Sequence, residues 1–352
     1  MSKEKYLILS NGQAGHTLKW VKELINDYDV YAFSLNGFSE EMRELLGESR
    51  IITYDASVNI SGGNISVLKS IPMVVSLIKR YKPSVINAHY LTSYGTLACF
   101  ASIISRYTGR LVLSAWGSDI LVTPWKNKLY YYLTKFVLGK ADLITSDAEF
   151  MSDKVKEIAD SARVMTFPFG IEKIPDMEYA EKDDKLFFSN RALEPNYNID
   201  KVVLLFSKLY KEDSNRRLVI ANDGTQREEL VNIVAALNLS DSVEFVGYLT
   251  KPRQAEYYKK SRWFISIPTS DSTSVSLLEA MSHGCVPIVS DLPANREWVN
   301  DGENGVIYED EEINVNICDP KIAYEKNREI IKERAIWSDC IARYKRELNE
   351  LY

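Results

Sequence analysis

Two carboxylates, Asp271 and Glu279, lie in the segment SDSTSVSLLEAMSHGCVPIVSD, which runs from Ser270 to Asp291. The segment is typical of a polar loop, a short apolar helix that ends at Gly284, and a buried strand. Asp271 belongs to the loop, whereas Glu279 interrupts the apolar run of the helix. Both carboxylates are therefore candidates for chemistry rather than for packing.

The hydroxyl residues Ser272, Thr273 and Ser274 lead directly into this predicted helix. The beginning of a helix carries free backbone N–H groups and the positive end of the helix dipole, which together favour a bound anion. This arrangement suits a phosphate group. The alternative is that the three hydroxyl side chains only cap the helix.

Apolar strand-like runs alternate with amphipathic helical stretches along the whole chain, which is typical of doubly wound parallel sheets. The first series of predicted strands covers residues 6–10, 30–34, 85–88, 111–115 and 143–145. The second series covers residues 186–189, 218–222, 243–246, 263–267 and 286–290. We therefore expect an α/β protein with two Rossmann-like domains, and a ligand cleft between them at the carboxyl ends of the strands.

The bulk properties exclude several classes of protein. At 352 residues the chain is long enough for two domains, and its net charge of −6 argues against non-specific nucleic-acid binding. No apolar run approaches the length of a membrane span, and MSKEKYLILSNG is predicted to be a first strand rather than a signal peptide. The four cysteines are far apart, which favours reduced thiols in the cytoplasm.

The run S-D-x7-E-A-M-x-x-G-x-P-x-V-x-S, followed by REWVNDGENGVIYE, resembles the C-terminal signature of family 4 retaining glycosyltransferases, which have the GT-B fold. Other segments are similar to further motifs of that family, in the same order: NGQAGH, NAHYLTSYGTLA, WGSD, FPFGIE, ANDGTQREEL, FVGYL and the closing helix IWSDCIARYKRELNELY. The resemblance implies a domain of residues 1–170 joined by the helix 336–352, and a nucleotide-sugar-binding domain of residues 185–335.

The resemblance also implies an activity of surface-polysaccharide type. A sugar would pass from a UDP- or GDP-sugar to a saccharide or lipid-linked saccharide, with retention of configuration. No cofactor and no divalent metal are expected. The sequence is consistent with this, because no D-x-D follows a predicted strand and only three histidines are present.

The resemblance assigns roles at the donor site. Glu279 would accept hydrogen bonds from the ribose, Asp271 would orient the transferred sugar where the family usually has a glutamate, and Arg191 would bind the diphosphate. The family's lysine six residues after this arginine is replaced by Tyr197, and Lys201 either supplies the missing cation or is a surface lysine. The remaining expected contacts to the nucleotide-sugar are Gly12, Gly224, Tyr248, Ser272, Thr273, Ser274 and Val275.

His89 follows the predicted buried strand SVINA. By resemblance it acts in catalysis beside the reacting sugar, together with Asp271 and Arg191; the alternative is a histidine satisfied within the core. Gly12 and Gly15 would let the first loop approach its ligands closely. The expected acceptor contacts are Gly15, His16, Trp116 and Asp119.

The segment from Thr123 to Lys140 interleaves lysines with aromatic residues, and KRYK at Lys79–Lys82 is also basic. This pattern fits a cytoplasmic protein held peripherally on anionic lipid at the inner face of the membrane. It fits equally well a helix that buries one aromatic face and solvates its lysines.

Two other functions remain open. A nucleotide-sugar epimerase would also use tandem Rossmann domains, although the E-A-M-x-x-G-x-P run and the few acid–base residues argue against it. A non-catalytic subunit that binds nucleotide-sugar is kept open by Tyr197 and Asp271, where the chain departs from the family pattern.

Overall fold

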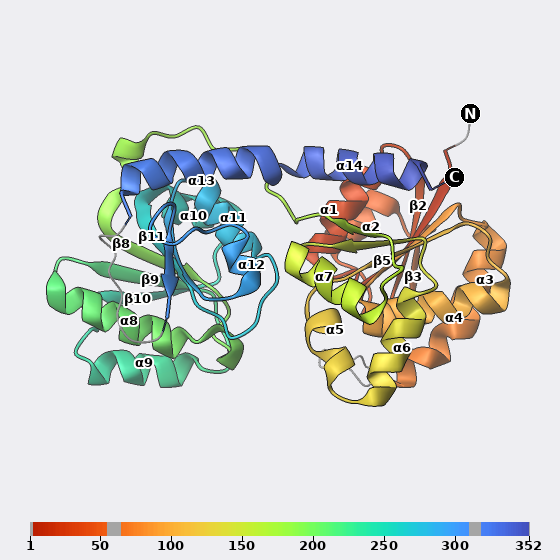
Figure 1. Ribbon diagram of the computed structural model, residues 1–352, viewed down its shortest axis with the longest axis horizontal. Coiled ribbons are helices and arrows are strands. Elements are labelled where there is room, and N and C mark those ends of the chain that lie inside the picture. The colour runs from red at the N-terminus through yellow and green to blue at the C-terminus, as the bar shows by residue number, and fades with distance from the viewer. Residues whose placement is uncertain (1–2, 55–64, 310–317, 352) are drawn as a thin grey trace. The chain divides into compact units, whose positions relative to one another are not determined.

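The computed structural model describes residues 3–54, 65–309 and 318–351. The chain forms two compact units, Met1–Phe167 with Ile341–Tyr352, and Pro168–Cys340. In each unit helices lie on both sides of one parallel sheet (Figure 1). The predicted fold class, two Rossmann-like α/β domains of the doubly wound type, is confirmed.

The first unit has a seven-stranded sheet in the order β3-β2-β1-β4-β5-β6-β7. Its strands are β1 (Lys5–Leu9), β2 (Asp29–Ser34), β3 (Ile51–Thr53), β4 (Val85–His89), β5 (Arg110–Ser114), β6 (Leu143–Ser146) and β7 (Val164–Thr166). Its helical segments are α1 (Gly15–Leu24), α2 (Glu40–Leu46), η1 (Ile65–Ser70), α3 (Ile71–Tyr81), η2 (Tyr90–Gly95), α4 (Thr96–Ser105), α5 (Ser118–Leu121), η3 (Thr123–Trp125), α6 (Lys128–Leu138) and α7 (Glu149–Ile158). The strand order reverses between β1 and β4, and ligands bind at such a switch point in open α/β sheets.

The closing helix α14 (Trp337–Asn349) contributes most of its length to the first unit. The Tyr344 hydroxyl lies 2.7 Å from the Tyr6 hydroxyl, and the Tyr344 ring packs edge-on against Trp20. The Arg110 guanidinium donates to the Leu348 carbonyl at 3.1 Å. These buried contacts attach α14 to β1, α1 and β5.

The second unit has a six-stranded sheet in the order β10-β9-β8-β11-β12-β13. Its strands are β8 (Asp183–Asn190), β9 (Arg217–Ala221), β10 (Val243–Gly247), β11 (Ser261–Ser266), β12 (Val286–Ser290) and β13 (Val306–Tyr308). Its helical segments are η4 (Tyr179–Glu181), η5 (Pro195–Tyr197), α8 (Ile199–Glu212), α9 (Arg227–Ala236), α10 (Lys251–Lys260), α11 (Val275–Ser282), α12 (Pro293–Arg296) and α13 (Pro320–Arg334). Here the order reverses between β8 and β11, so the segments that follow these two strands lie next to each other.

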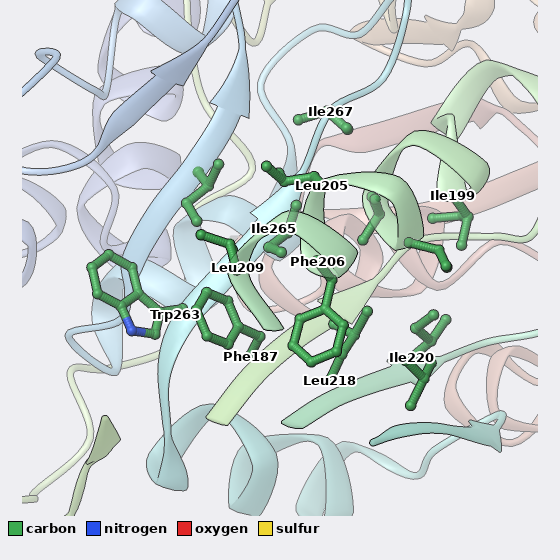
Figure 2. Packing of buried hydrophobic residues seen from close by; sticks show 14 of the residues in the cluster. Phe187, Ile199, Leu205, Phe206, Leu209, Leu218, Ile220, Trp263, Ile265 and Ile267 are labelled. Atoms are coloured by element: carbon green, nitrogen blue, oxygen red, sulfur yellow. The ribbon is translucent and has the colours of Figure 1, made fainter. Parts of the chain in front are cut away.

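A hydrophobic core packs α8 against this second sheet (Figure 2). The Phe187 ring of β8 stacks on Trp263 of β11 with centroids 5.7 Å apart, and it meets Phe206 of α8 edge-on at 5.8 Å. Aliphatic side chains from β9, β11 and α8 fill the space around these rings. Because all of these side chains are buried, the core fixes where β8 ends and where α8 begins.

Candidate active site

The loop between β11 and α11 holds its hydroxyl side chains inward. The Ser274 hydroxyl caps α11 by accepting from the Leu277 N–H at 3.4 Å, and the Thr273 hydroxyl accepts from the Trp298 indole N–H at 3.3 Å. The Ser272 N–H donates to the Asp271 carboxylate at 3.1 Å. Ser274 thus caps the helix, as the alternative interpretation expected of all three hydroxyls, whereas Thr273 binds Trp298. The positive end of α11 still faces this loop.

Arg191, directly after β8, joins this loop to the end of the sheet. Its guanidinium donates to an Asp271 carboxylate oxygen at 2.7 Å and also to the Ser274 hydroxyl. The Tyr197 ring lies against the guanidinium, with the Arg191 Cζ 4.4 Å from the ring centroid. The structure therefore brings together four residues that the sequence analysis assigned to the donor site from separate segments.

Asp271 is mostly buried beside this cation. Burial raises the pKa of its carboxyl group, and the Arg191 charge and the Ser272 N–H offset only part of that rise. Arg191 itself is only 9% exposed. The pair thus keeps a positive group and a carboxylate together at the start of α11.

Glu279, on α11, is bound by three side chains of α10. One carboxylate oxygen accepts from the Lys251 ammonium at 2.6 Å, and the other accepts from the Gln254 amide at 2.9 Å and the Tyr258 hydroxyl at 3.3 Å. Burial and the nearby Glu279 charge raise the pKa of Tyr258, so its hydroxyl remains a donor. Sequence analysis missed these partners, although the spacing of Gln254 and Tyr258 places both on one face of a helix.

The other residues predicted at the donor site occupy different environments. A side chain at Gly224 would collide with the Leu193 carbonyl, so this glycine lets the loop after β9 approach the segment after β8. Tyr248 follows Gly247 and is 76% exposed, and Lys201 is an exposed residue in the first turn of α8. Val275 is the first residue of α11.

In the first unit, His89 ends β4 and is buried. Its Nδ1 lies 3.2 Å from the Ser10 hydroxyl, and its Nε2 lies 2.9 Å from the Asn87 side-chain oxygen. The Asn87 amide nitrogen donates to Val112 and Ser114, so its oxygen accepts and the His89 Nε2 carries the hydrogen. Burial lowers the pKa of His89 to about 3, which keeps the imidazole neutral. The ring has the environment of the core-histidine alternative.

Asp119, which the sequence analysis expected as an acceptor contact, is also buried. One carboxylate oxygen accepts from the Trp116 N–H at 3.0 Å and the other from the Leu91 N–H at 2.9 Å. Burial raises its pKa, and these N–H groups offset part of the rise. With 0% of its surface exposed, Asp119 joins the turn after β4 to the turn after β5.

Two of the predicted residues of the first unit, His16 and His89, lie beside the indole of Trp116. The exposed His16 meets this ring edge-on with centroids 5.0 Å apart, and His89 lies 5.0 Å away on a tilted plane. Gly15 begins α1 with open space around it, whereas a side chain at Gly12 would collide with Phe38. The need for glycine at position 12 is therefore explained by packing within the unit.

Two known protein families match the sequence of this chain. Residues 171–318 match the family described as "Glycosyl transferases group 1", and residues 5–148 match the family described as "Glycosyl transferase 4-like". The chain belongs to family 4 of the glycosyltransferases. The expectation of the GT-B fold is confirmed.

Two curated glycosyltransferases are similar to part of this chain. The alpha-monoglucosyldiacylglycerol synthase of Streptococcus pneumoniae is 25% identical over 207 residues, which cover 54% of this chain and 46% of the relative. The N-acetylgalactosamine-N,N'-diacetylbacillosaminyl-diphospho-undecaprenol 4-alpha-N-acetylgalactosaminyltransferase of Campylobacter jejuni is 24% identical over 195 residues, which cover 52% of each chain. The aligned part thus spans about half the length of these two relatives.

Two solved structures share the whole fold with this family 4 chain. Anabaena Alr3699/HepE in complex with UDP aligns with a TM-score of 0.76 at 14% identity, over 99% of this chain and 100% of that one. The sucrose-phosphate synthase of Thermosynechococcus elongatus aligns with a TM-score of 0.77 at 14% identity, over 99% of both chains. At these identities the likeness shows the fold alone.

Proposed function

We propose that the protein transfers a sugar from a UDP- or GDP-sugar to a saccharide or lipid-linked saccharide, with retention of configuration, in cell-surface polysaccharide biosynthesis. The observation that carries the proposal is the placement of Arg191 at the start of α11, bound to Asp271 and Ser274. A cation beside the positive end of a helix stabilises the charge that develops on a leaving diphosphate. No divalent metal and no cofactor are required in this proposal.

The carboxylates of the second unit would divide the donor between them. Asp271 would orient the transferred sugar, while Glu279 would accept hydrogen bonds from the ribose hydroxyls. Gln254 and Tyr258 hold one oxygen of Glu279 from the protein side, so the ribose would replace Lys251 at the other oxygen.

The acceptor would meet the first unit around Trp116, with His16 and Gly15 beside it. The flat indole can stack on a sugar face, and the His16 side chain next to it is exposed. Asp119 would act from behind, because it is buried and its carboxylate binds the backbone N–H groups of Trp116 and Leu91. The buried His89 would act through its ring, which lies against Trp116.

The names of relatives favour an acceptor at a lipid surface. One relative is named for a glucosyldiacylglycerol product and another for a diphospho-undecaprenol substrate. In the described part of this chain no helix is long and apolar enough to span a bilayer. In this proposal the contact with lipid is peripheral, at the cytoplasmic face of the membrane.

Exposed aromatic and aliphatic side chains of η3, α4 and α6 form the surface that would make this contact. The Phe100 ring of α4 stacks on Phe136 of α6 with centroids 6.0 Å apart, which joins the two helices. The exposed apolar side chains are Ile103, Ile104, Trp125, Leu129, Tyr132 and Phe136. The exposed lysines of the same segment are Lys126, Lys128, Lys135 and Lys140. Apolar residues bordered by lysines fit an anionic lipid surface.

A panel of UDP-, GDP- and ADP-sugars, incubated with the protein in the presence of EDTA, tests the reaction. Released sugar supports the transferase, isomerised sugar indicates an epimerase, and binding without turnover indicates an inert subunit. A rate that collapses with EDTA and returns with manganese would contradict metal independence.

Sedimentation with anionic liposomes tests the lipid surface. The variant with Lys126, Lys128 and Lys135 all changed to glutamate should remain in solution, while the wild type sediments at low salt. A wild type that stays in solution would mean that these lysines are only a solvated helix face.

A further inference from the structure

The Tyr197 ring gives the Arg191 guanidinium a fixed surface on which to lie. The 4.4 Å from the guanidinium carbon to the ring centroid is within the range of cation–π attraction, which strengthens when the pair is shielded from water. Arg191 is nine-tenths buried, and the half-buried Tyr197 also packs against the hydrophobic core that Figure 2 shows. The ring is therefore held by the core and in turn supports the cation.

The residues on either side of Tyr197 fasten it to the loop that carries Asp271. The Asn196 carbonyl accepts from the Thr269 N–H at 2.8 Å, and the Asn196 amide donates to the Ser270 carbonyl at 2.9 Å. The Asn198 amide donates to the Ile267 carbonyl at 2.8 Å. The ring and the carboxylate that contact Arg191 thus belong to one hydrogen-bonded arrangement.

Three side chains therefore hold the Arg191 guanidinium in place. Asp271 and Ser274 bind its N–H groups through hydrogen bonds, while its central carbon lies over the Tyr197 ring. A charge held in place before the ligand arrives does not have to be reorganised as a leaving group departs.

We infer that Tyr197 is a positioning residue, which orients Arg191 for the diphosphate and does not bind the donor itself. This inference rests on the proposed function, because Arg191 acts there on the leaving diphosphate. It revises the expectation from the sequence, in which Tyr197 was a donor contact that had replaced a lysine.

Nuclear magnetic resonance of the ligand-free protein tests the stacking on its own. The Nε–H signal of Arg191, assigned by its absence in Arg191→Lys, should carry a ring-current shift. Tyr197→Phe should keep this shift, and Tyr197→Leu should abolish it. Tyr210→Leu is the matched control, because Tyr210 packs on the same core through Phe206 and should leave the signal in place. An Arg191 signal that is unchanged in Tyr197→Leu would overturn the inference, whatever the protein does with nucleotides.

Turnover of the donor tests the consequence. Tyr197→Leu should lower kcat about tenfold, in line with a shielded cation–π contact, while Tyr197→Phe stays near the wild type. In the Arg191→Ala background Tyr197→Leu should have no further effect. An equal loss in both backgrounds would mean that Tyr197 acts independently of Arg191 and would overturn the inference. If the wild type turns over none of the UDP-, GDP- or ADP-sugars, the proposed function fails, and the resonance experiment still decides the stacking.

Discussion

His89 and Asp119 of the first unit are 1% and 0% exposed, whereas the side chains of Asp271 and Glu279 in the second unit are 22% and 18% exposed. The first pair is hydrogen-bonded to neighbouring strands and turns. Each member of the second pair is bound to a cation instead. A buried group that already has its hydrogen-bond partners within the protein fixes the loops around it. A partly exposed carboxylate can instead accept a hydrogen bond from a ligand.

The cations that bind these two carboxylates, Arg191 and Lys251, also differ in how much of each side chain is exposed. The Arg191 side chain is 10% exposed and Lys251 is 76% exposed. Breaking a buried ion pair by removing one partner costs about 3–5 kcal/mol, while an exposed pair contributes about 0–1 kcal/mol. Arg191 should therefore remain in place throughout a reaction cycle, whereas Lys251 can give way to the ribose.

The largest effect is expected from Arg191→Ala. If this cation stabilises the leaving diphosphate, kcat should fall about 100-fold to 1000-fold, the range found when one donor to a developing charge is removed. The fall in kcat should exceed any rise in KM, because the interaction strengthens as the glycosidic bond breaks. Arg217→Ala, which removes an exposed arginine paired with Asp183, is the control. A change confined to KM would show that Arg191 only binds the donor.

Asp271→Asn should come next. We expect turnover to fall tenfold to 1000-fold, or roughly 1.4–4 kcal/mol, because the carboxylate would no longer orient the sugar. Calorimetry should find the affinity for free UDP or GDP nearly unchanged, since Asp271 is not expected to touch the nucleoside. Lost nucleotide affinity in this variant would assign Asp271 to the nucleoside instead.

Glu279→Gln should show the complementary pattern. The substitution keeps the shape of the side chain and removes its charge, so binding of UDP or GDP should weaken by roughly 1.5–3 kcal/mol. Calorimetry on this variant beside Asp271→Asn separates the two roles. Unimpaired binding and turnover in both variants would refute both assignments.

Acid should destabilise the protein through His89. An unfolded histidine has a pKa of about 6.5, and burial lowers the pKa of His89 to about 3. The unfolded state therefore binds more protons between these values, so the free energy of unfolding falls as the pH drops through this window. Between pH 7 and pH 5 the loss from this group should be about 2 kcal/mol.

Urea unfolding at both pH values, with the wild type and His89→Gln, measures that loss. In His89→Gln the free energy of unfolding should fall less on acidification than in the wild type. The remaining fall should include the contribution of His283, because burial lowers its pKa to about 4. If both proteins lose the same free energy of unfolding on acidification, His89 is not the closed core group that the comparison requires.

Part of the candidate site could be predicted because its residues are close in sequence. Asp271, Ser274 and Glu279 lie in one loop and one helix, so the pattern of residues fixed their local structure. The contact of Tyr197 with Arg191 could not be predicted, since it depends on where η5 packs on the core and on the bonds of Asn196 to another loop.

The same distinction holds for the fold. The sequence predicted the long buried strands, such as β4, but missed β3, β7 and β13, which are sheet-edge strands of three residues each. Three residues are too few to show a period, and an edge strand needs less burial than a central one. Burial of His89 was likewise undecidable, because the pattern places it at a strand end without saying which side chains close over it.

The smallest effect is expected from Lys251→Ala. This lysine occupies the Glu279 oxygen that the ribose would use, at 2.6 Å, yet its side chain is 76% exposed. Its removal would free that oxygen, and since exposed pairs contribute about 0–1 kcal/mol, the affinity for UDP or GDP should rise by at most about fivefold at low salt. The gain should shrink as salt screens the pair. Lys259→Ala is the control, because Lys259 lies on the same helix and also forms an exposed ion pair, with Glu181. A tenfold loss of affinity in Lys251→Ala would mean that Lys251 itself binds the nucleotide. The Lys251–Glu279 pair would then not be one that the ribose replaces, and its contrast with the buried Arg191–Asp271 pair would fail.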